Sequence, residues 1–70
     1  MHKELLIIRC GEKYIRYRDG KYMPCLFDKA SVFPVENSEA VRYHLDRVRK
    51  AGFDNACIKK LVIREEDWSG

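Results

Sequence analysis

The sequence predicts a small α+β domain: a mixed or mostly antiparallel four-stranded sheet, in the order β-β-β-α-β, with one helix packed on one face. Three observations indicate this fold. An Asp19-Gly20 dipeptide separates two aromatic, alternating runs, which is a strong hairpin signal. An amphipathic stretch ends at Gly52 and is typical of a helix. The chain has 70 residues, 46% of them hydrophobic and 36% charged, which suffices for a single core.

The first half of the chain predicts three strands joined by two tight turns. Residues 4–10 form the first strand, and their four consecutive apolar residues indicate burial on both faces. Gly11-Glu12 suits a type II′ turn before a strand over residues 13–18, and Asp19-Gly20 suits a type I′ turn before a third strand over residues 21–27. Pro24 lacks a backbone N–H, so we expect this third strand at the edge of the sheet.

The second half predicts a connection, a helix and a last strand. Residues 28–36 connect, with one helical turn at 28–30. Asn37 or Ser38 caps a helix that runs to about residue 51. Residues 56–65 form a fourth strand, expected to lie beside the first strand and parallel to it, which gives the sheet order 3-2-1-4. The domain spans residues 1–65, and residues 66–70 form a flexible acidic tail. The inward stripe of the helix comprises Val41, His44, Leu45 and Val48.

Two-residue turns fix the register, and the register sorts the side chains onto two faces. In this register Leu6 lies opposite Tyr17. The last strand adds Lys60 and Arg64 to the open side if Leu61 and Ile63 point to the helix. The side under the helix comprises Leu6, Ile8, Ile15, Tyr17, Tyr22, Pro24 and Leu26. The open side comprises Leu5, Ile7, Arg9, Tyr14, Arg16, Arg18, Lys21, Met23, Cys25 and Phe27.

The open side is basic, and its charge indicates an anionic partner. Residues 1–27 contain six Lys or Arg and three acidic residues, within a chain of formal net charge +3. We interpret the protein as a small binding or interaction domain that uses this face to contact a protein partner. An acidic partner fits best, and weak self-association is the other form of protein contact. The predicted contact residues are Arg9, Tyr14, Arg16, Arg18, Lys21 and Lys60.

Two other functions agree with the same pattern. The first is binding of single-stranded nucleic acid by the same face, with cations on phosphates and Tyr14 stacked on a base. The second is a non-catalytic subunit or fragment of an enzyme complex. A purely solvated sheet face is the alternative to any function, because Lys and Arg keep exposed strands from aggregating.

The sequence carries no pattern typical of an enzyme, a metal site or a cofactor site, and we expect none of the three. Cys10, Cys25 and Cys57 lack the close spacing of zinc ligands and indicate free thiols in a reducing compartment. His44 is expected to be a partly buried histidine with a hydrogen-bond partner. No apolar stretch is long enough to span a membrane or to act as a signal peptide, so the expected location is the cytoplasm.

The middle of the chain resembles a loose pattern found in small bacterial and phage proteins without an assigned activity. In that pattern, an aromatic strand and an Asp-Gly turn precede a second strand. An Ala and a Phe then stand before a helix that begins with Glu-Ala, and an apolar strand follows. The resemblance covers about residues 14–63 and implies a small α+β domain without implying a site. The segment from Pro34 to Glu36 departs from it. The matching residues are Tyr14 to Tyr17, Asp19-Gly20, Tyr22, Ala30, Phe33, Glu39-Ala40 and Ile58 to Ile63.

Overall fold

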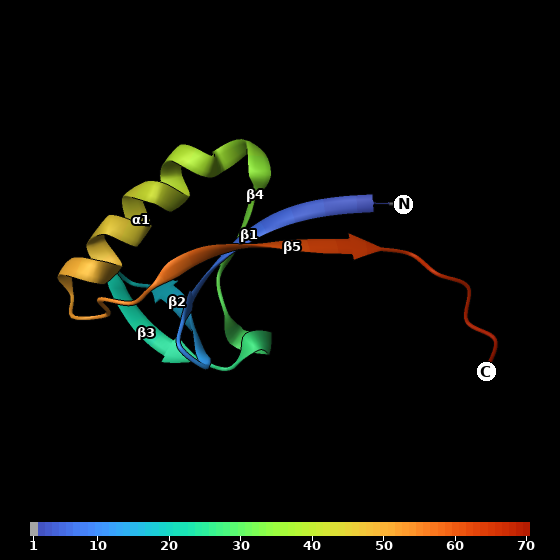
Figure 1. Cartoon of the computed structure of the whole chain (residues 1–70), viewed down its shortest axis with the longest axis horizontal. Coiled ribbons are helices and arrows are strands. Elements are labelled where there is room, and N and C mark those ends of the chain that lie inside the picture. Colours follow the sequence, from blue (N-terminus) through green and yellow to red (C-terminus); the bar gives the residue numbers. More distant parts are fainter. Residues whose placement is uncertain (1) are drawn as a thin grey trace.

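Residues 2–70 contain one α-helix and five strands, and the strands form an open antiparallel sheet (Figure 1). The computed structural model describes residues 2–70. This architecture confirms the predicted α+β class and adds one short strand to it. In chain order the elements are β1 (His2–Cys10), β2 (Lys13–Arg18), β3 (Lys21–Cys25), the 3-10 turn η1 (Phe27–Lys29), β4 (Val32–Pro34), the 3-10 turn η2 (Val35–Asn37), α1 (Ser38–Lys50) and β5 (Cys57–Arg64).

Both predicted turns are present, and each has the backbone that its residues favour. Asp19 and Gly20 have φ angles of +53° and +74°, as a type I′ turn requires. Gly11 has a φ of +61°, and Glu12 is not in the positive region, which agrees with type II′. These turns set the pairing of β1 with β2 and of β2 with β3, and β3, which contains Pro24, is an edge strand as predicted.

β1 and β2 separate after two residue pairs, and the segment around β4 fills the gap between them. The Ser31 N–H donates to the Ile15 carbonyl at 3.2 Å, and the Ser31 Oγ accepts from the Tyr17 N–H at 2.9 Å. One residue later, β4 pairs with β1 and places Phe33 opposite Leu6. The expectation that Leu6 faces Tyr17 was therefore wrong, because β2 has left β1 before that point.

β5 lies beside β1, as predicted, but it runs antiparallel to β1 rather than parallel. Eight residue pairs join the two strands, from His2–Arg64 to Arg9–Cys57. β4 explains the difference, because it reverses the chain once more before α1. The helix then returns the chain in the opposite sense to the one expected.

The main core lies between α1 and one face of the sheet. Val41 and Val48 from α1 are fully buried against Ile8 and Ile15, and Leu45 and His44 lie beside them, which confirms the predicted helix stripe. Tyr22 packs against the same core. Leu26 was expected under the helix, but it is 63% exposed because β3 ends at Cys25.

The side of the sheet away from α1 is not fully open, since β1 has one buried residue on each side. Ile8 points to the helix, so its neighbour Ile7 points to the other side of the sheet. Ile7 is nevertheless completely buried. Its cross-strand neighbours are Val32 in β4 and Lys59 in β5. The four-residue apolar run of β1 thus has the two-sided burial that its sequence predicted.

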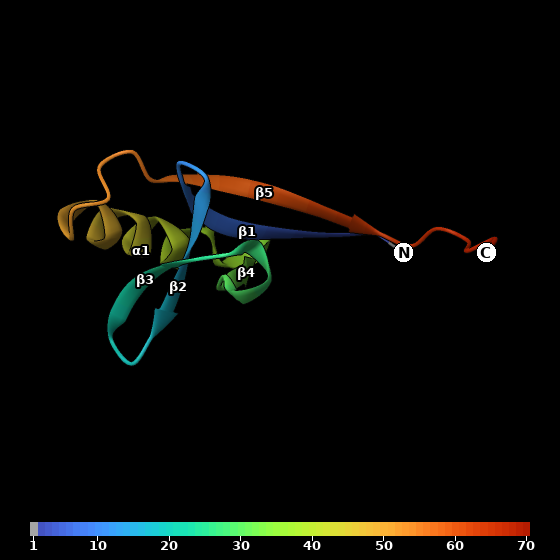
Figure 2. The same cartoon turned by 90° about the horizontal axis from the view of Figure 1, so that it is seen from below.

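Beyond the helix, β1 and β5 continue as a two-stranded ribbon (Figures 1 and 2). This ribbon contributes to an elongated shape of 45 × 25 × 22 Å. Val62 and Ile63 in the ribbon are each 50% exposed. Among residues 2–70, no helix has both the length and the apolar character needed to cross a membrane.

We expect Gly20→Ala to lower the free energy of unfolding by about 1–2 kcal/mol, because an L side chain is disfavoured at positive φ. Open space surrounds the position of the new Cβ, so strain in the backbone is the only cost. Urea titration followed by circular dichroism measures the change. Lys21→Ala, at an ordinary φ, is the control. Equal stability of Gly20→Ala and the parent protein would contradict the type I′ turn.

We expect Ile7→Val and Ile8→Val each to cost about 0.5–1.5 kcal/mol in the same titration, because both side chains are buried. Ile63→Val, at a half-exposed position of the ribbon, is the control and should cost less. If Ile7→Val behaved like Ile63→Val, the side of β1 away from the helix would be solvated rather than packed.

Candidate functional site

The candidate site is the basic face, which we define by the side chains of Arg9, Tyr14, Arg16, Arg18 and Lys21 on the side of the sheet away from α1. The β2–β3 register pairs Tyr14 with Cys25, Arg16 with Met23 and Arg18 with Lys21, so these residues share one side. Arg9 joins them because it lies opposite Tyr14. Five of the six predicted contact residues are therefore together, as expected.

The ring of Tyr14 is occupied by contacts within the protein. Phe27 meets it edge-on, with ring centroids 5.2 Å apart and an interplanar angle of 74°. The Arg9 guanidinium carbon lies 5.8 Å from the ring centroid, and Arg9 Nε donates a 2.8 Å hydrogen bond to the Gly11 carbonyl. Tyr14 is half-buried as a result, and Phe27 is the more exposed ring of the pair, at 53%.

The cations of the basic face have little internal neutralisation. Arg18 lies 3.7 Å from the Asp19 carboxylate, and both side chains are largely exposed to water. Within residues 2–70, Arg9, Arg16 and Lys21 form no ion pair within 4 Å. Arg18 and Lys21 stand directly opposite each other, which is an unfavourable like-charge pair in the isolated protein. An anionic partner would relieve this repulsion.

Lys60, the sixth predicted contact residue, lies on the opposite side of the sheet. It pairs with Leu6, whose side chain points to the helix side, and its Nζ lies 3.7 Å from the Glu4 carboxylate. The prediction assumed that Leu61 points to the helix, but Leu61 lies opposite Leu5 on the other side. A shift of one residue exchanges the faces of a strand, so Lys59 takes the position expected for Lys60. Arg64, which was expected on the open side too, shares the side of Lys60 for the same reason.

Cys25 reports on the electrostatics of the basic face. Its thiol is half-buried and donates to the Tyr14 carbonyl at 3.5 Å. Burial raises the pKa of the Cys25 thiol above 9.0, and the negative charge of Asp28 adds to this effect. The nearby Arg16 cation opposes it, because a positive charge stabilises the thiolate.

On the helix side, His44 stands among aromatic rings. Its ring centroid lies 4.7 Å from that of Tyr17 and 5.5 Å from that of Phe33. The Tyr22 hydroxyl and His44 Nδ1 are 2.8 Å apart and hydrogen-bonded. The expectation of a half-buried histidine with a polar partner is confirmed, and these contacts attach the β2–β3 hairpin to α1.

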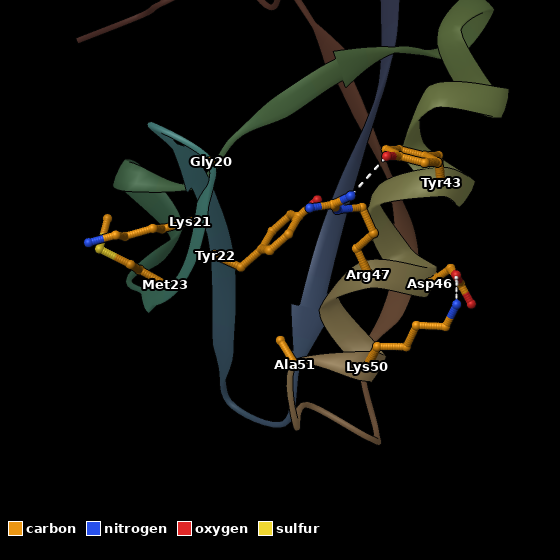
Figure 3. Close-up of a pocket in the computed structure, with 9 residues that line it drawn as sticks. All are labelled: Gly20, Lys21, Tyr22, Met23, Tyr43, Asp46, Arg47, Lys50 and Ala51. Atoms are coloured by element: carbon orange, nitrogen blue, oxygen red, sulfur yellow. Dashed lines mark hydrogen bonds and ion pairs between the residues drawn. The ribbon is translucent and has the colours of Figure 1, made fainter.

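A groove of about 740 Å³ lies between β3 and α1, and the sequence did not indicate it (Figure 3). Figure 3 shows Tyr22 pointing toward Arg47, whereas Lys21 and Met23 project from the other side of β3. Arg47 donates a 2.9 Å hydrogen bond to the Tyr43 hydroxyl, which raises the pKa of Arg47. The spacing of Tyr43 and Arg47, four residues apart, is the one signal of this contact in the sequence.

The polar groups of the groove are largely paired with one another. The Arg47 guanidinium carbon also lies 5.4 Å from the centre of the Tyr43 ring. Lys50 forms a 3.0 Å ion pair with Asp46 one turn away. A charged ligand would have to displace these contacts, so the groove is a weaker candidate for an anion site than the basic face.

No metal centre is evident in the part of the chain that the structure describes. There, no three His, Cys, Asp or Glu side chains converge as ligands. The three cysteines are free thiols, and Cys10 Sγ lies 2.9 Å from the Asn55 side-chain oxygen.

We expect the folded protein to form the Cys25 thiolate at higher pH than the unfolded chain, whose thiol has a pKa near 9.0. The raised pKa adds stability that is complete below that pH and is lost as pH rises through the folded value. Alkylation by iodoacetamide at a series of pH values, followed by mass spectrometry, measures the midpoint at Cys25. Arg16→Gln should raise this midpoint further, whereas Arg42→Gln on the exposed helix surface should not. A lower midpoint in Arg16→Gln would contradict the placement of Arg16 beside Cys25.

Comparisons with protein-family models, with curated proteins and with solved structures gave no match to this chain. The surfaces of the chain itself therefore carry the functional proposals that follow.

Proposed function

We propose that this protein is an interaction module whose basic face binds an acidic segment of a partner protein. The observation that carries the proposal is the grouping of four cations on one side of the sheet with little neutralisation by acids of the same chain. Desolvating such a face against a neutral partner would be costly, whereas a carboxylate-rich partner offers compensating charge-assisted hydrogen bonds.

Apolar side chains beside these cations favour a protein over a simple polyanion. Met23 is 42% exposed and lies opposite Arg16, and Phe27 is 53% exposed against Tyr14. An amphipathic acidic segment would place apolar side chains on these two residues and carboxylates on the surrounding cations. Interfaces of this kind combine an apolar centre with a charged rim.

Single-stranded nucleic acid is the second candidate for the same face, and the position of Tyr14 makes it less favourable. Base stacking needs an accessible aromatic face, and Tyr14 is half-buried between Phe27 and Arg9. The Phe27 ring is half-exposed and offers a surface on which a base can stack, so the experiment below includes a nucleic-acid probe. The other alternative, a non-catalytic subunit of an enzyme complex, is also a protein interaction. In that case the catalytic chain would be the partner that docks on this face.

The test is an NMR titration of the labelled protein with three probes at low and moderate salt. The probes are a peptide of alternating Glu and Leu, a poly-Glu peptide of equal length and an oligo-dT strand. We expect the alternating peptide to bind most tightly and to shift the signals of Arg16, Arg18 and Met23. Tighter binding of oligo-dT, with the steep salt dependence of phosphate contacts, would favour the nucleic-acid function instead.

The variant Arg18→Glu/Lys21→Glu separates charge from stability. It replaces one like-charge cross-strand pair with another and removes the Arg18–Asp19 ion pair, which is exposed to water and contributes little, so the stability of the hairpin should change little. We expect peptide affinity to fall by about tenfold or more, since two attractive contacts become repulsive. The control Lys29→Glu/Arg42→Glu makes the same net change at exposed positions outside the basic face and should bind normally. Equal loss of affinity in both variants would mean that net charge alone determines peptide binding, and it would contradict the proposed face.

A further inference from the structure

In the part of the chain that the structure describes, the outer edge of β5 is unpaired along its whole length. β5 hydrogen-bonds to β1 on one side, and within residues 2–70 no strand pairs with its other side. Figure 2 shows β5 along the upper side of the ribbon with β1 below it, and β3 and β4 lie below β1. A free edge of eight residues presents unpaired N–H and C=O groups and is a template for another strand.

β5 has one feature by which edge strands avoid pairing, the cations Lys59, Lys60 and Arg64, but it is long and no other element covers its outer edge within residues 2–70. It contains no proline, and Val62 and Ile63 are each half-exposed near its C-terminal end. The edge strand on the opposite side of the sheet, β3, is shorter and contains Pro24. The two edges therefore differ, and β5 is the one suited to adding a strand.

The sequence of β5 is complementary to itself when two copies run antiparallel. A two-fold axis perpendicular to the sheet joins equivalent edges and keeps each face on the same side. With Val62 of both copies on this axis, Leu61 of one copy lies opposite Ile63 of the other. Lys59 then lies opposite Glu65, the residue that directly follows β5. Apolar residues thus meet at the centre, and opposite charges meet on both sides.

One kind of like-charge contact occurs in this register, twice by symmetry, and acids of the same chain already moderate it. Lys60 of one copy lies opposite Arg64 of the other. Lys60 is 3.7 Å from the Glu4 carboxylate, and Arg64 is 3.9 Å from that of Glu66. Moving the axis to Ile63 would instead place Leu61 opposite Glu65 and Val62 opposite Arg64, so both apolar residues beside the axis would meet charges. In the Val62 register a mismatch of this kind, Ile58 opposite Glu66, lies away from the axis. The register centred on Val62 is therefore the better one.

We propose that two copies of this chain associate through their β5 edges, antiparallel and centred on Val62, into one continuous sheet. This contact is separate from the basic face, because it uses the backbone edge of β5 rather than a face of β2 and β3. The occupant of the edge is a second copy, since both the central apolar pairs and the Lys59–Glu65 pairs arise from the same short segment.

Sedimentation equilibrium of the whole chain over a wide concentration range tests the association. We expect a reversible monomer–dimer equilibrium. Lys59→Glu should weaken it by about tenfold, because two opposite-charge pairs per dimer become two like-charge pairs. The double variant Lys59→Glu/Glu65→Lys should restore the parent dissociation constant. Lys13→Glu, an equal charge change at the far end of the β1–β2 hairpin, is the control and should leave the constant unchanged.

Two further measurements make the outcome decisive. Val62→Lys places two ammonium groups at the axis and should give a monomer, and circular dichroism checks that this half-exposed substitution leaves the fold intact. Arg18→Glu/Lys21→Glu should dimerise normally, which separates this inference from the function of the basic face. A parent protein that is monomeric at all concentrations would overturn the proposal. A dimer that survives Val62→Lys, or that the double variant fails to restore, would overturn the proposed edge pairing.

Discussion

The backbone of β1 is the constraint on which the rest of the structure depends. A central strand cannot leave its N–H and C=O groups unpaired in the interior, so each of its edges needs a partner along the buried part. β5 satisfies one edge over eight pairs. On the other edge β2 leaves after two pairs, and β4 completes the pairing. The insertion of β4 brings Phe33 under the helix and Ser31 against β2. It also reverses the chain, which makes β5 antiparallel.

The sequence predicted the features that depend on neighbouring residues and missed those that depend on distant ones. Asp19-Gly20 specified a turn through its own φ angles, and four contact residues followed from it onto the basic face. The Gly11-Glu12 turn added Arg9 through its pairing with Tyr14. β4 has three residues and ends in Pro34, so it has too little alternation to be recognised. Lys60 was misplaced because Lys59 and Lys60 are adjacent, and both alternations of β5 contain apolar residues. The groove beside Arg47 needs the hairpin and α1 to meet, which no local pattern encodes.

The face and the edge of the sheet serve different kinds of contact. Side chains on a face recognise charge and shape, whereas an edge offers backbone hydrogen bonds that any extended segment can satisfy. A two-fold axis perpendicular to the sheet would set the basic faces of two copies side by side on one surface. Two basic faces held together in this way would bind one long acidic segment more tightly than a single face does. The second binding step is then intramolecular and has a high effective concentration, without any new contact.

The ribbon formed by the outer halves of β1 and β5 has a consequence for the dynamics of the chain. The helix core is built from Ile8, Ile15, Val41, Val48 and Ala56, and the outer pairs, such as His2–Arg64, lie beyond it. Amide protons there should exchange with solvent through fraying that leaves the helix core closed, as in other proteins whose segments open independently. The ribbon can then lose and regain order at a small fraction of the global unfolding free energy.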